Sequence, residues 1–198
     1  MTSERARRVL LTDTIVLENS HVRLEPLTNA HSADLADARE GLDYAWYTAI
    51  PASVPEEIER RLAEHRAGRM NPWAVVADGR AVGMTTFCNI DQANRHVEIG
   101  YTWLSPGVQR TGVNTAAKRL LLEHAFEACD AIAVEFRTSW HNRQSRAAIE
   151  RLGARRDGVL RNDRISPDGT LRDTVVYSIL PHEWPGVRNG LDAALRRR

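Results

Sequence analysis

The segment Gln109-Arg110-Thr111-Gly112-Val113-Asn114 decides the fold, because it joins a predicted strand to a predicted helix. The strand runs from Arg95 to Leu104, and apolar residues at helical spacing indicate a helix from near Gly112 to Ala128. Alternation predicts one strand face made of Val97, Ile99, Tyr101 and Trp103 and another made of Glu98, Gly100, Thr102 and Leu104. Main-chain N–H groups at a helix start are unpaired and attract anions, so this junction can hold a pyrophosphate. A single glycine at a helix start also occurs as a plain turn.

Strands and helices are predicted on both sides of this junction. Asp78-Gly79 between two apolar runs indicates a hairpin, and Asn142 is placed to cap a helix that ends at Gly153. In chain order, the other predicted elements are a strand-like segment from Val16 to Leu27 with a turn or bulge at Asn19-Ser20, helices from Ala30 to Arg39 and from Pro55 to Gly68, hairpin strands from Trp73 to Ala77 and from Ala81 to Phe87, and strands from Ala131 to Thr138, Arg156 to Ile165 and Thr170 to Leu180. This order predicts an α/β fold.

The length of 198 residues fits one domain. Residues 1–14 are polar and lack periodicity, so we predict a flexible N-terminal arm there, a single domain over 15–182 and a helical tail over 183–198. Cys88 and Cys129 do not have the spacing of a disulfide framework or a zinc site. We therefore expect no metal and a reducing, cytoplasmic location.

The overall charge is close to neutral, with a net charge of +1 and a pI of about 7.9. Such a chain has no overall field that would attract nucleic acid or a membrane surface. No run approaches the ~20 apolar residues of a membrane span, and the apolar run near the N-terminus is too short for a signal peptide. The terminal Arg196-Arg197-Arg198 is more typical of a solvated tail than of a nucleic-acid site. We expect neither a nucleic-acid nor a membrane partner.

Three motifs together resemble a known family. They are Gln109-x-x-Gly112 between strand and helix, Asn142-x-x-Ser145 at the opening of the next helix, and Leu152-Gly153-Ala154 at its end. The combination resembles the GNAT superfamily and, within it, the branch with bacterial ribosomal-protein-alanine N-acetyltransferases. The resemblance covers roughly residues 20–180 and is most specific over 96–154. It implies a GNAT-like mixed, mostly antiparallel sheet of six or seven strands, split where the cofactor enters, with helices on both faces.

The resemblance implies acetyl-CoA, or another acyl-CoA, as co-substrate. The family's phosphate motif ends in Gly or Ala where this chain has Asn114, a residue type that can still cap a helix or donate to an anion. The pantetheine arm would pair with main chain near Trp103 and Leu104, although Trp103 also suits a core position. The implied cofactor-binding residues are Trp103, Leu104, Gln109, Arg110, Thr111, Gly112, Val113, Asn114, Asn142 and Ser145.

Acyl transfer to an amine needs a base for the amine and an acid for the departing thiolate. Glu98 is the candidate base, acting directly or through water, because the resemblance places its strand between acyl donor and acceptor. Ser145 matches a position that would donate to the sulfur, and Asn142 would orient the site. Each catalytic candidate has a structural alternative: an ion-paired glutamate at 98, a helix cap at 142 and a first-turn serine at 145.

Histidine is an alternative base, because it titrates near neutral pH. His124 lies on the apolar side of its predicted helix and suits a core position. His96 and His141 border the predicted cleft and are minor candidates.

The resemblance implies an N-acyltransferase that moves an acetyl or related acyl group from acyl-CoA to an amine by direct transfer in a ternary complex. The acceptor stays open between a protein N-terminus and a small molecule. Its pocket is predicted to be shaped by Tyr44, Trp46, Tyr47 and Trp73. The alternative, which Asn114 keeps open, is a non-catalytic acyl-CoA-binding module on the same fold. A homodimer is expected from the resemblance alone.

Overall fold

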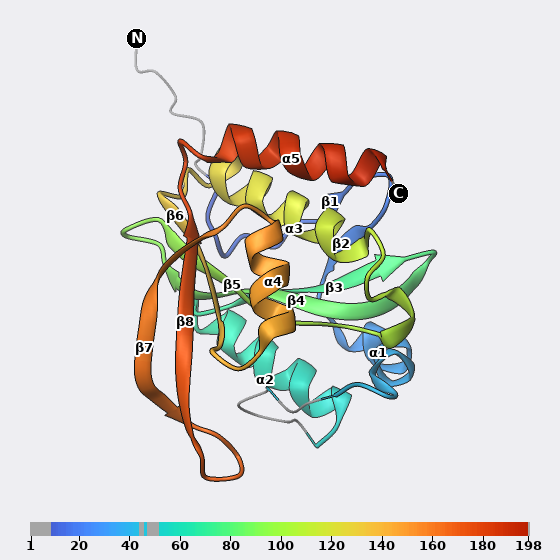
Figure 1. Ribbon diagram of the computed structural model, residues 1–198. Coiled ribbons are helices and arrows are strands. Elements are labelled where there is room, and N and C mark those ends of the chain that lie inside the picture. Colours follow the sequence, from blue (N-terminus) through green and yellow to red (C-terminus); the bar gives the residue numbers. More distant parts are fainter. Residues whose placement is uncertain (1–8, 44–45, 47–51, 198) are drawn as a thin grey trace.

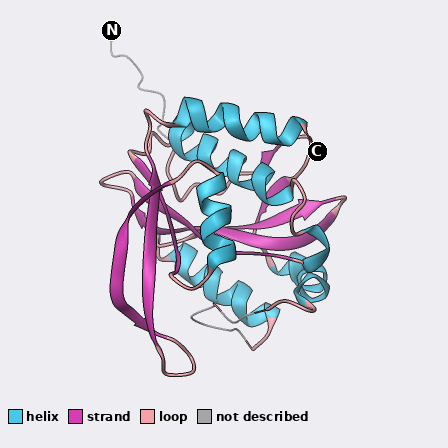
Figure 2. Ribbon diagram, in the orientation of Figure 1, coloured by secondary structure: helices cyan, strands magenta, loops and turns pink. Residues whose placement is uncertain are grey.

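The computed structural model describes residues 9–43, 46 and 52–197. Within them, one sheet of eight strands forms the centre, in the order β1-β2-β3-β4-β5-β6-β8-β7 (Figures 1 and 2). The strands are β1 (Leu17–Glu18), β2 (Arg23–Pro26), β3 (Asn71–Ala77), β4 (Arg80–Asp91), β5 (His96–Leu104), β6 (Ala133–Ser139), β7 (Arg155–Ile165) and β8 (Leu171–Ile179). Among these described strands, only β5 and β6 pair in parallel. This confirms the predicted mixed, mostly antiparallel sheet.

Helices cover both faces of the sheet, as predicted. They are α1 (Ser32–Arg39), α2 (Val54–Arg66), α3 (Val113–Glu123), α4 (Arg143–Arg151) and α5 (Trp184–Arg196). Helices α3, α4 and α5 pack into the larger core with β5, β6 and β8, whereas α1 and α2 pack into a smaller core on the other face. In the view of Figure 1, α3 and α5 lie above the central strands and α1 and α2 lie below them.

The sheet has one strand more than the predicted six or seven, because the segment 16–27 folds as two strands. The side chain of Asn19 causes the split, since its Oδ1 accepts the main-chain N–H groups of His21 at 2.9 Å and Val22 at 3.0 Å. This local turn directs the chain back on itself and lets β1 pair with β2.

Local sequence signals are confirmed at three places. Asp78 and Gly79 take the positive φ values of 50° and 75° that a tight β3–β4 hairpin requires. The Asn142 side chain caps α4 by accepting the N–H of Ser145 at 2.9 Å. Gly153 follows α4 with a φ of 97°, which favours glycine.

The ends of the described chain pack more closely than the sequence predicted. Leu11 lies in the main core, and its N–H donates to Gln92 Oε1 at 2.9 Å. The flexible arm predicted for residues 1–14 is therefore wrong for residues 9–14, and residues 1–8 lie outside the described part. The predicted tail is helix α5, which buries Trp184 and Leu191 against the core.

A β-bulge interrupts β5 and changes which residues share a face. Gly100 pairs with Thr86 and Trp103 with Met84, so β5 contains one residue more than β4 over this interval. Tyr101 at the bulge has a φ of 48°. The bulge reverses the alternation, so Leu104 rejoins the main core while Trp103 packs into the smaller one. The predicted single face from Val97 through Trp103 is therefore wrong beyond Gly100.

The sheet splits between β5 and β6. Their pairing covers only His96 to Glu98 on one strand and Ala133 to Glu135 on the other. Both strands continue beyond these residues but no longer pair with each other, which leaves a gap that we call the fork. No helix in the described part of the chain is both long and apolar enough to cross a membrane.

Candidate functional site

Two helix N-termini lie beyond the open end of the fork. Because β5 and β6 run parallel, the segments that follow them leave the same edge of the sheet. The segment after β5 enters α3 at Val113, and the segment after β6 enters α4 at Arg143. Each helix start presents unpaired N–H groups and positive potential. Residues 109–114 and 142–145, predicted separately to bind the same co-substrate, are thus placed at one edge.

The junction before α3 is held in shape by two of its own side chains. Gln109 Nε2 donates to the Leu104 carbonyl at 3.0 Å, which ties the loop to the end of β5. Thr111 Oγ1 donates to the Val108 carbonyl at 2.7 Å and accepts the Val113 N–H at 3.3 Å. Gln109 and Thr111 therefore shape the loop, which leaves ligand contacts to its main chain.

The start of α3 leaves main-chain donors available. The first helical bond runs from the Ala116 N–H to the Gly112 carbonyl at 2.9 Å. The N–H groups of Gly112, Asn114 and Thr115 make no hydrogen bond to the part of the chain that the structure describes. Arg110, just before this turn, has a φ of 64°, and such a strained backbone is common where a loop binds a ligand. The arrangement suits an anion such as a pyrophosphate.

Asn142 and Ser145 leave donors at the start of α4. Oδ1 of Asn142 is occupied by the capping bond. Neither Nδ2 of Asn142 nor the Ser145 hydroxyl has a hydrogen-bond partner among the described residues. Capping therefore fixes the two residues and leaves one amide donor and one hydroxyl for a ligand.

Glu98 lies at the base of the fork, as the last residue of β5 that pairs with β6. Its side chain is buried, with 8% of its surface exposed. Asn89 Nδ2 donates to Oε2 at 2.7 Å, and Arg137 Nε lies 3.6 Å from the same oxygen. Burial raises the pKa of Glu98, while the Asn89 hydrogen bond and the Arg137 charge oppose the rise. A carboxyl with a raised pKa is a stronger base than an ordinary glutamate, which suits it to accept a proton.

Gly100 leaves room for the Glu98 carboxylate. A Cβ atom added at Gly100 would lie 3.0 Å from Glu98 Oε1 and 2.9 Å from Cys88 Sγ. Any larger residue would therefore displace the carboxylate or the neighbouring strand.

Glu98 lies on the face of the sheet opposite to the two helix N-termini. On β5, it alternates with Val97 and Ile99, which pack into the core under α3 and α4. The same alternation places polar residues of β6 and β8 on the face of Glu98. We call this surface the fork face, and it comprises Glu98, Glu135, Arg137, Arg172 and Thr174. A molecule that bound at the helix starts would have to reach Glu98 through the fork.

The bulge of β5 is held from the α2 side by Arg61. This side chain is 2% exposed and is ion-paired with Glu57 at 2.6 Å. Its other nitrogens donate to Thr86 Oγ1 at 2.6 Å and to the Tyr101 carbonyl at 3.0 Å. Every nitrogen of this guanidinium is therefore satisfied by the chain itself.

Lys118 of α3 holds the bulge from the other side. Its Nζ lies 2.6 Å from Thr102 Oγ1 and 3.1 Å from Thr85 Oγ1. Complete burial lowers the pKa of Lys118 to about 7. We call Arg61, Lys118 and their partners Glu57, Thr85, Thr86, Tyr101 and Thr102 the bulge clamp. Neither cation was singled out as functional from the sequence.

The predicted acceptor residues do not form one group. Trp73 is fully buried, packs edge-on against Phe87 at 5.1 Å and donates its Nε1–H to the Ile15 carbonyl at 2.9 Å, which does not fit contact with a substrate. Trp46 is 44% exposed. Tyr44 and Tyr47 lie outside the described residues.

The two residues predicted beside the pantetheine have core side chains. Trp103 and Leu104 are both buried, on opposite faces of β5. Both residues lie beyond the part of β5 that pairs with β6, and the Leu104 carbonyl already accepts the hydrogen bond from Gln109.

Of the three histidines considered as alternative bases, His124 lies in the core, as the sequence predicted. His124 is a core residue, which stacks on Phe87 at 6.0 Å and whose pKa is lowered by burial. His96 Nε2 lies 3.3 Å from Glu135 Oε1, while His141 is exposed. Among the described residues, no three His, Cys, Asp or Glu side chains are grouped as metal ligands.

Sequence reasoning missed Asn89 and Arg137, the two partners of Glu98. Asn89 lies in an irregular stretch of β4 and has a φ of 48°, a conformation that asparagine tolerates. Arg137 could have been found, because it alternates with the apolar residues of a strand predicted to be buried.

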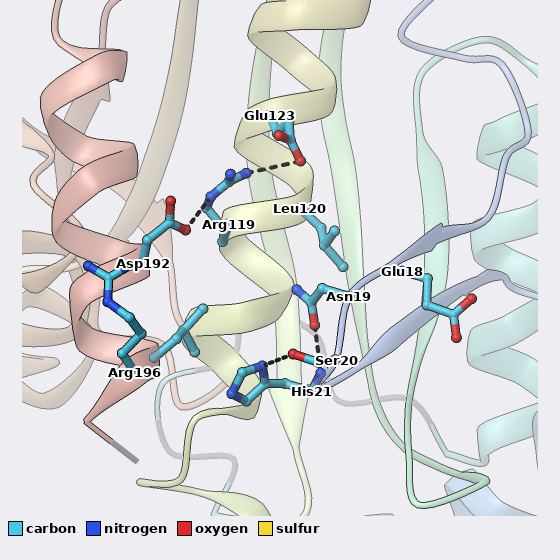
Figure 3. Close-up of a pocket in the computed structure, with 10 residues that line it drawn as sticks. Glu18, Asn19, Ser20, His21, Arg119, Leu120, Glu123, Asp192 and Arg196 are labelled. Atoms are coloured by element: carbon cyan, nitrogen blue, oxygen red, sulfur yellow. Dashed lines mark hydrogen bonds and ion pairs between the residues drawn. The ribbon is translucent and has the colours of Figure 1, made fainter.

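A separate hollow of 290 Å³ lies between the β1–β2 turn, α3 and α5, away from the fork (Figure 3). Its central cation, Arg119, is ion-paired with Glu123 at 3.0 Å and with Asp192 at 2.9 Å. Asn19 in its wall donates to the Ala116 carbonyl at 3.3 Å. The contacts with Asp192 and Asn19 join α3 to α5 and to the β1–β2 turn, so the hollow is not part of the candidate site.

Known proteins resemble this chain in sequence and in fold. Over 109 residues it is 39% identical to the Bacillus subtilis (strain 168) protein named "Putative ribosomal N-acetyltransferase YdaF", an alignment that covers 55% of this chain and 58% of YdaF. The chain thus spans little more than half the length of this relative.

Two solved structures match nearly the whole chain. A GCN5-related N-acetyltransferase from Brucella melitensis has a TM-score of 0.84 and 29% identity, over 92% of this chain and 86% of that one. Mycobacterium smegmatis RimJ, solved in complex with CoA-disulfide, has a TM-score of 0.77 and 26% identity, over 92% and 96%.

The model of the acetyltransferase (GNAT) domain matches residues 21–155, which is more than half of the chain and includes the fork, the bulge and both helix starts. This chain therefore belongs to the GNAT acetyltransferase domain family.

Proposed function

We propose that this protein is an N-acetyltransferase, which moves the acetyl group of acetyl-CoA directly onto an amine. The position of Glu98 carries the proposal: it is a buried carboxyl with a raised pKa at the base of the fork, facing away from the helix starts. Family membership and the names of YdaF and the Brucella melitensis protein support the same activity.

On the donor side, this chain would hold acetyl-CoA mainly through main-chain groups. The unpaired N–H groups of Gly112, Asn114 and Thr115 suit the pyrophosphate, and Asn142 Nδ2 suits an amide carbonyl of the pantetheine. The asparagine at 114 does not block this role, because the donor that it supplies is its main-chain N–H. Acetyl-CoA provides the thioester carbonyl that the amine attacks.

On the acceptor side, Glu98 would take a proton from the amine as the new C–N bond forms. The C–S bond breaks in the same reaction, and the Ser145 hydroxyl would supply the proton that the sulfur needs. One proton is lost by the nitrogen and one is gained by the sulfur; solvent then removes the proton from Glu98 and returns one to Ser145, so the transfer balances without a covalent enzyme intermediate. General acid and base groups of this kind contribute about 10²- to 10⁴-fold each.

For the acceptor, we propose an amine on a protein. The support is the name of YdaF, which assigns that relative to ribosomal N-acetylation. A homodimer and a cytoplasmic location stay predictions.

The proposal is tested by calorimetric titration of the purified chain with acetyl-CoA, CoA and a longer acyl-CoA. We expect saturable one-site binding of acetyl-CoA, followed by release of free thiol when a panel of peptides and small amines is added. Absence of binding to every CoA species in folded protein would contradict the donor site. Binding without turnover on any amine would instead support the non-catalytic module.

A further inference from the structure

Arg172 of β8 is a cation whose hydrogen bonding is left incomplete by the part of the chain that the structure describes. It is partly buried, and its Nη1 donates to the Trp46 carbonyl at 3.3 Å. Its Nε is buried and has no hydrogen-bond partner, and no carboxylate ion-pairs with it, among the described residues. The segment 44–51 next to Trp46 contains no Asp or Glu in its sequence. A cation that is partly removed from water without an anion is unfavourable.

A second arginine faces Arg172 across the β7–β8 hairpin. Arg164 pairs with Arg172 in register, so their side chains leave the same face of the sheet. Like charges directly opposite each other destabilise a pair of strands. Burial lowers the pKa of Arg172, and the Arg164 charge lowers it further. Arg164 has Asp163 at 3.6 Å, which leaves Arg172 as the cation of this pair that lacks a partner.

Thr174 adds an unsatisfied hydroxyl beside Arg172. It lies two residues further along β8, and alternation places it on the same face. Thr174 is 2% exposed, yet its Oγ1 has no hydrogen-bond partner in the described part of the chain. A buried polar group without a partner costs about 1–3 kcal/mol. Two such groups side by side indicate a position where a ligand completes the bonding.

These groups lie on the fork face together with Glu98. The Glu98 charge acts on Arg172 and raises its pKa, and the Arg164 charge acts on Glu98 and lowers its pKa. The register of β5 with β6 and of β6 with β8 places the unsatisfied donors on the same face as the carboxyl that would accept the proton of the amine.

We propose that the acceptor site binds a carboxylate near the amine that is acetylated, and that Arg172 is the residue that recognises it. This inference rests on the proposed function. A guanidinium donates two parallel hydrogen bonds to a carboxylate; Nε of Arg172 would give one of them, and the Thr174 hydroxyl is a further donor on the same face. The charges of Asp163 and Glu98 already act on Arg172, so a single negative charge fits better than a phosphate with two.

A carboxylate near an amine can come from two sources. It can be an acidic side chain among the first residues of a polypeptide, or the α-carboxylate of a free amino acid. The first source agrees with a protein acceptor, and the two are separated by the choice of probe.

The test measures binding to the full chain saturated with CoA, so that it does not depend on turnover. The probes are the peptide amides Ala-Glu-Ala-Ala and Ala-Ala-Glu-Ala, each matched with its Gln counterpart, and alanine matched with alaninamide. Calorimetry compares the wild type with Arg172→Gln. Arg161→Gln is the control, because Arg161 is an exposed arginine of the same hairpin with its own partner, Asp173, at 2.6 Å.

We expect at least one carboxylate probe to bind the wild type about tenfold more tightly than its neutral match, a preference that Arg172→Gln abolishes and Arg161→Gln retains. Equal affinities for every matched pair, no binding of any probe, or a preference that survives Arg172→Gln would overturn the inference. Thiol release is measured separately. Selective binding of the acidic probes without turnover would therefore contradict the proposed function but support the carboxylate site.

Discussion

The bulge clamp and the fork face both contain a buried or partly buried arginine. The two arginines differ in whether other residues of the chain satisfy all their hydrogen-bond donors. Arg61 in the clamp has a carboxylate, a hydroxyl and a carbonyl as partners. Arg172 on the fork face has one carbonyl and a buried Nε without a partner. A charge that the chain itself completes serves the fold, whereas a charge that it leaves incomplete marks a surface where a ligand can bind.

Removing the carboxylate of the clamp should give the largest effect on stability. Glu57→Ala leaves Arg61 buried without its ion-pair partner, and breaking a buried pair in this way costs about 3–5 kcal/mol. Chemical denaturation measures the free energy of unfolding. Glu56→Ala, at the exposed neighbouring position, is the matched control and should change stability by less than about 1 kcal/mol.

The same measurement on Arg172→Gln sharpens the comparison. Since this substitution removes a partly buried charge that has no ion-pair partner among the described residues, we expect a change within about 0.5 kcal/mol or a gain in stability. A loss for Arg172→Gln as large as that for Glu57→Ala would show that both arginines serve the fold.

Lys118, the second cation of the clamp, should make stability depend on pH. Its pKa is about 7 in the folded protein against 10.5 for an ordinary lysine, so between these values the unfolded chain binds a proton that the folded chain does not. Stability attributable to Lys118 is therefore present above pH 10.5 and is lost as the pH falls toward 7, with a slope of about 1.4 kcal/mol per pH unit.

Lys118→Met should remove that slope. Denaturation of wild type and variant at several pH values above 7 gives the difference between their slopes. Parallel curves for the two proteins would mean that Lys118 is charged in the folded state.

The smallest effect is expected at Asn89, whose donor keeps the pKa of Glu98 from rising further. Asn89→Gly removes this hydrogen bond but tolerates the φ of 48°. The acid limb of the pH profile of kcat/KM should move to higher pH, while the rate on the alkaline side of that limb is retained. A shift to lower pH would be inconsistent with Glu98 as the titrating base.

The elements of the fold could be predicted because their signals are local. Asp78-Gly79, the Asn142 cap and Gly153 each satisfy a nearby backbone requirement, and the structure confirms all three. The β5 bulge could not be predicted, because it depends on Arg61 and Lys118 reaching it from two helices distant in sequence. Strict alternation therefore failed at Tyr101.

The part of the candidate site that lies in a sequence motif could be predicted. The part that is formed by residues on neighbouring strands could not. Gly112, Asn142 and Ser145 follow from the helix starts. Arg172 and Thr174 become visible only through the register of β8 with β7 and through hydrogen bonds that the fold leaves unmade.

The most direct test of the account compares wild type with Glu98→Gln, using the best amine from the thiol-release panel. We predict that kcat/KM falls about 100-fold or more at neutral pH, that its acid limb disappears, and that acetyl-CoA affinity by calorimetry is unchanged. An unchanged kcat/KM with the same acid limb, in a variant that still binds acetyl-CoA, would contradict the assignment of Glu98 as the base.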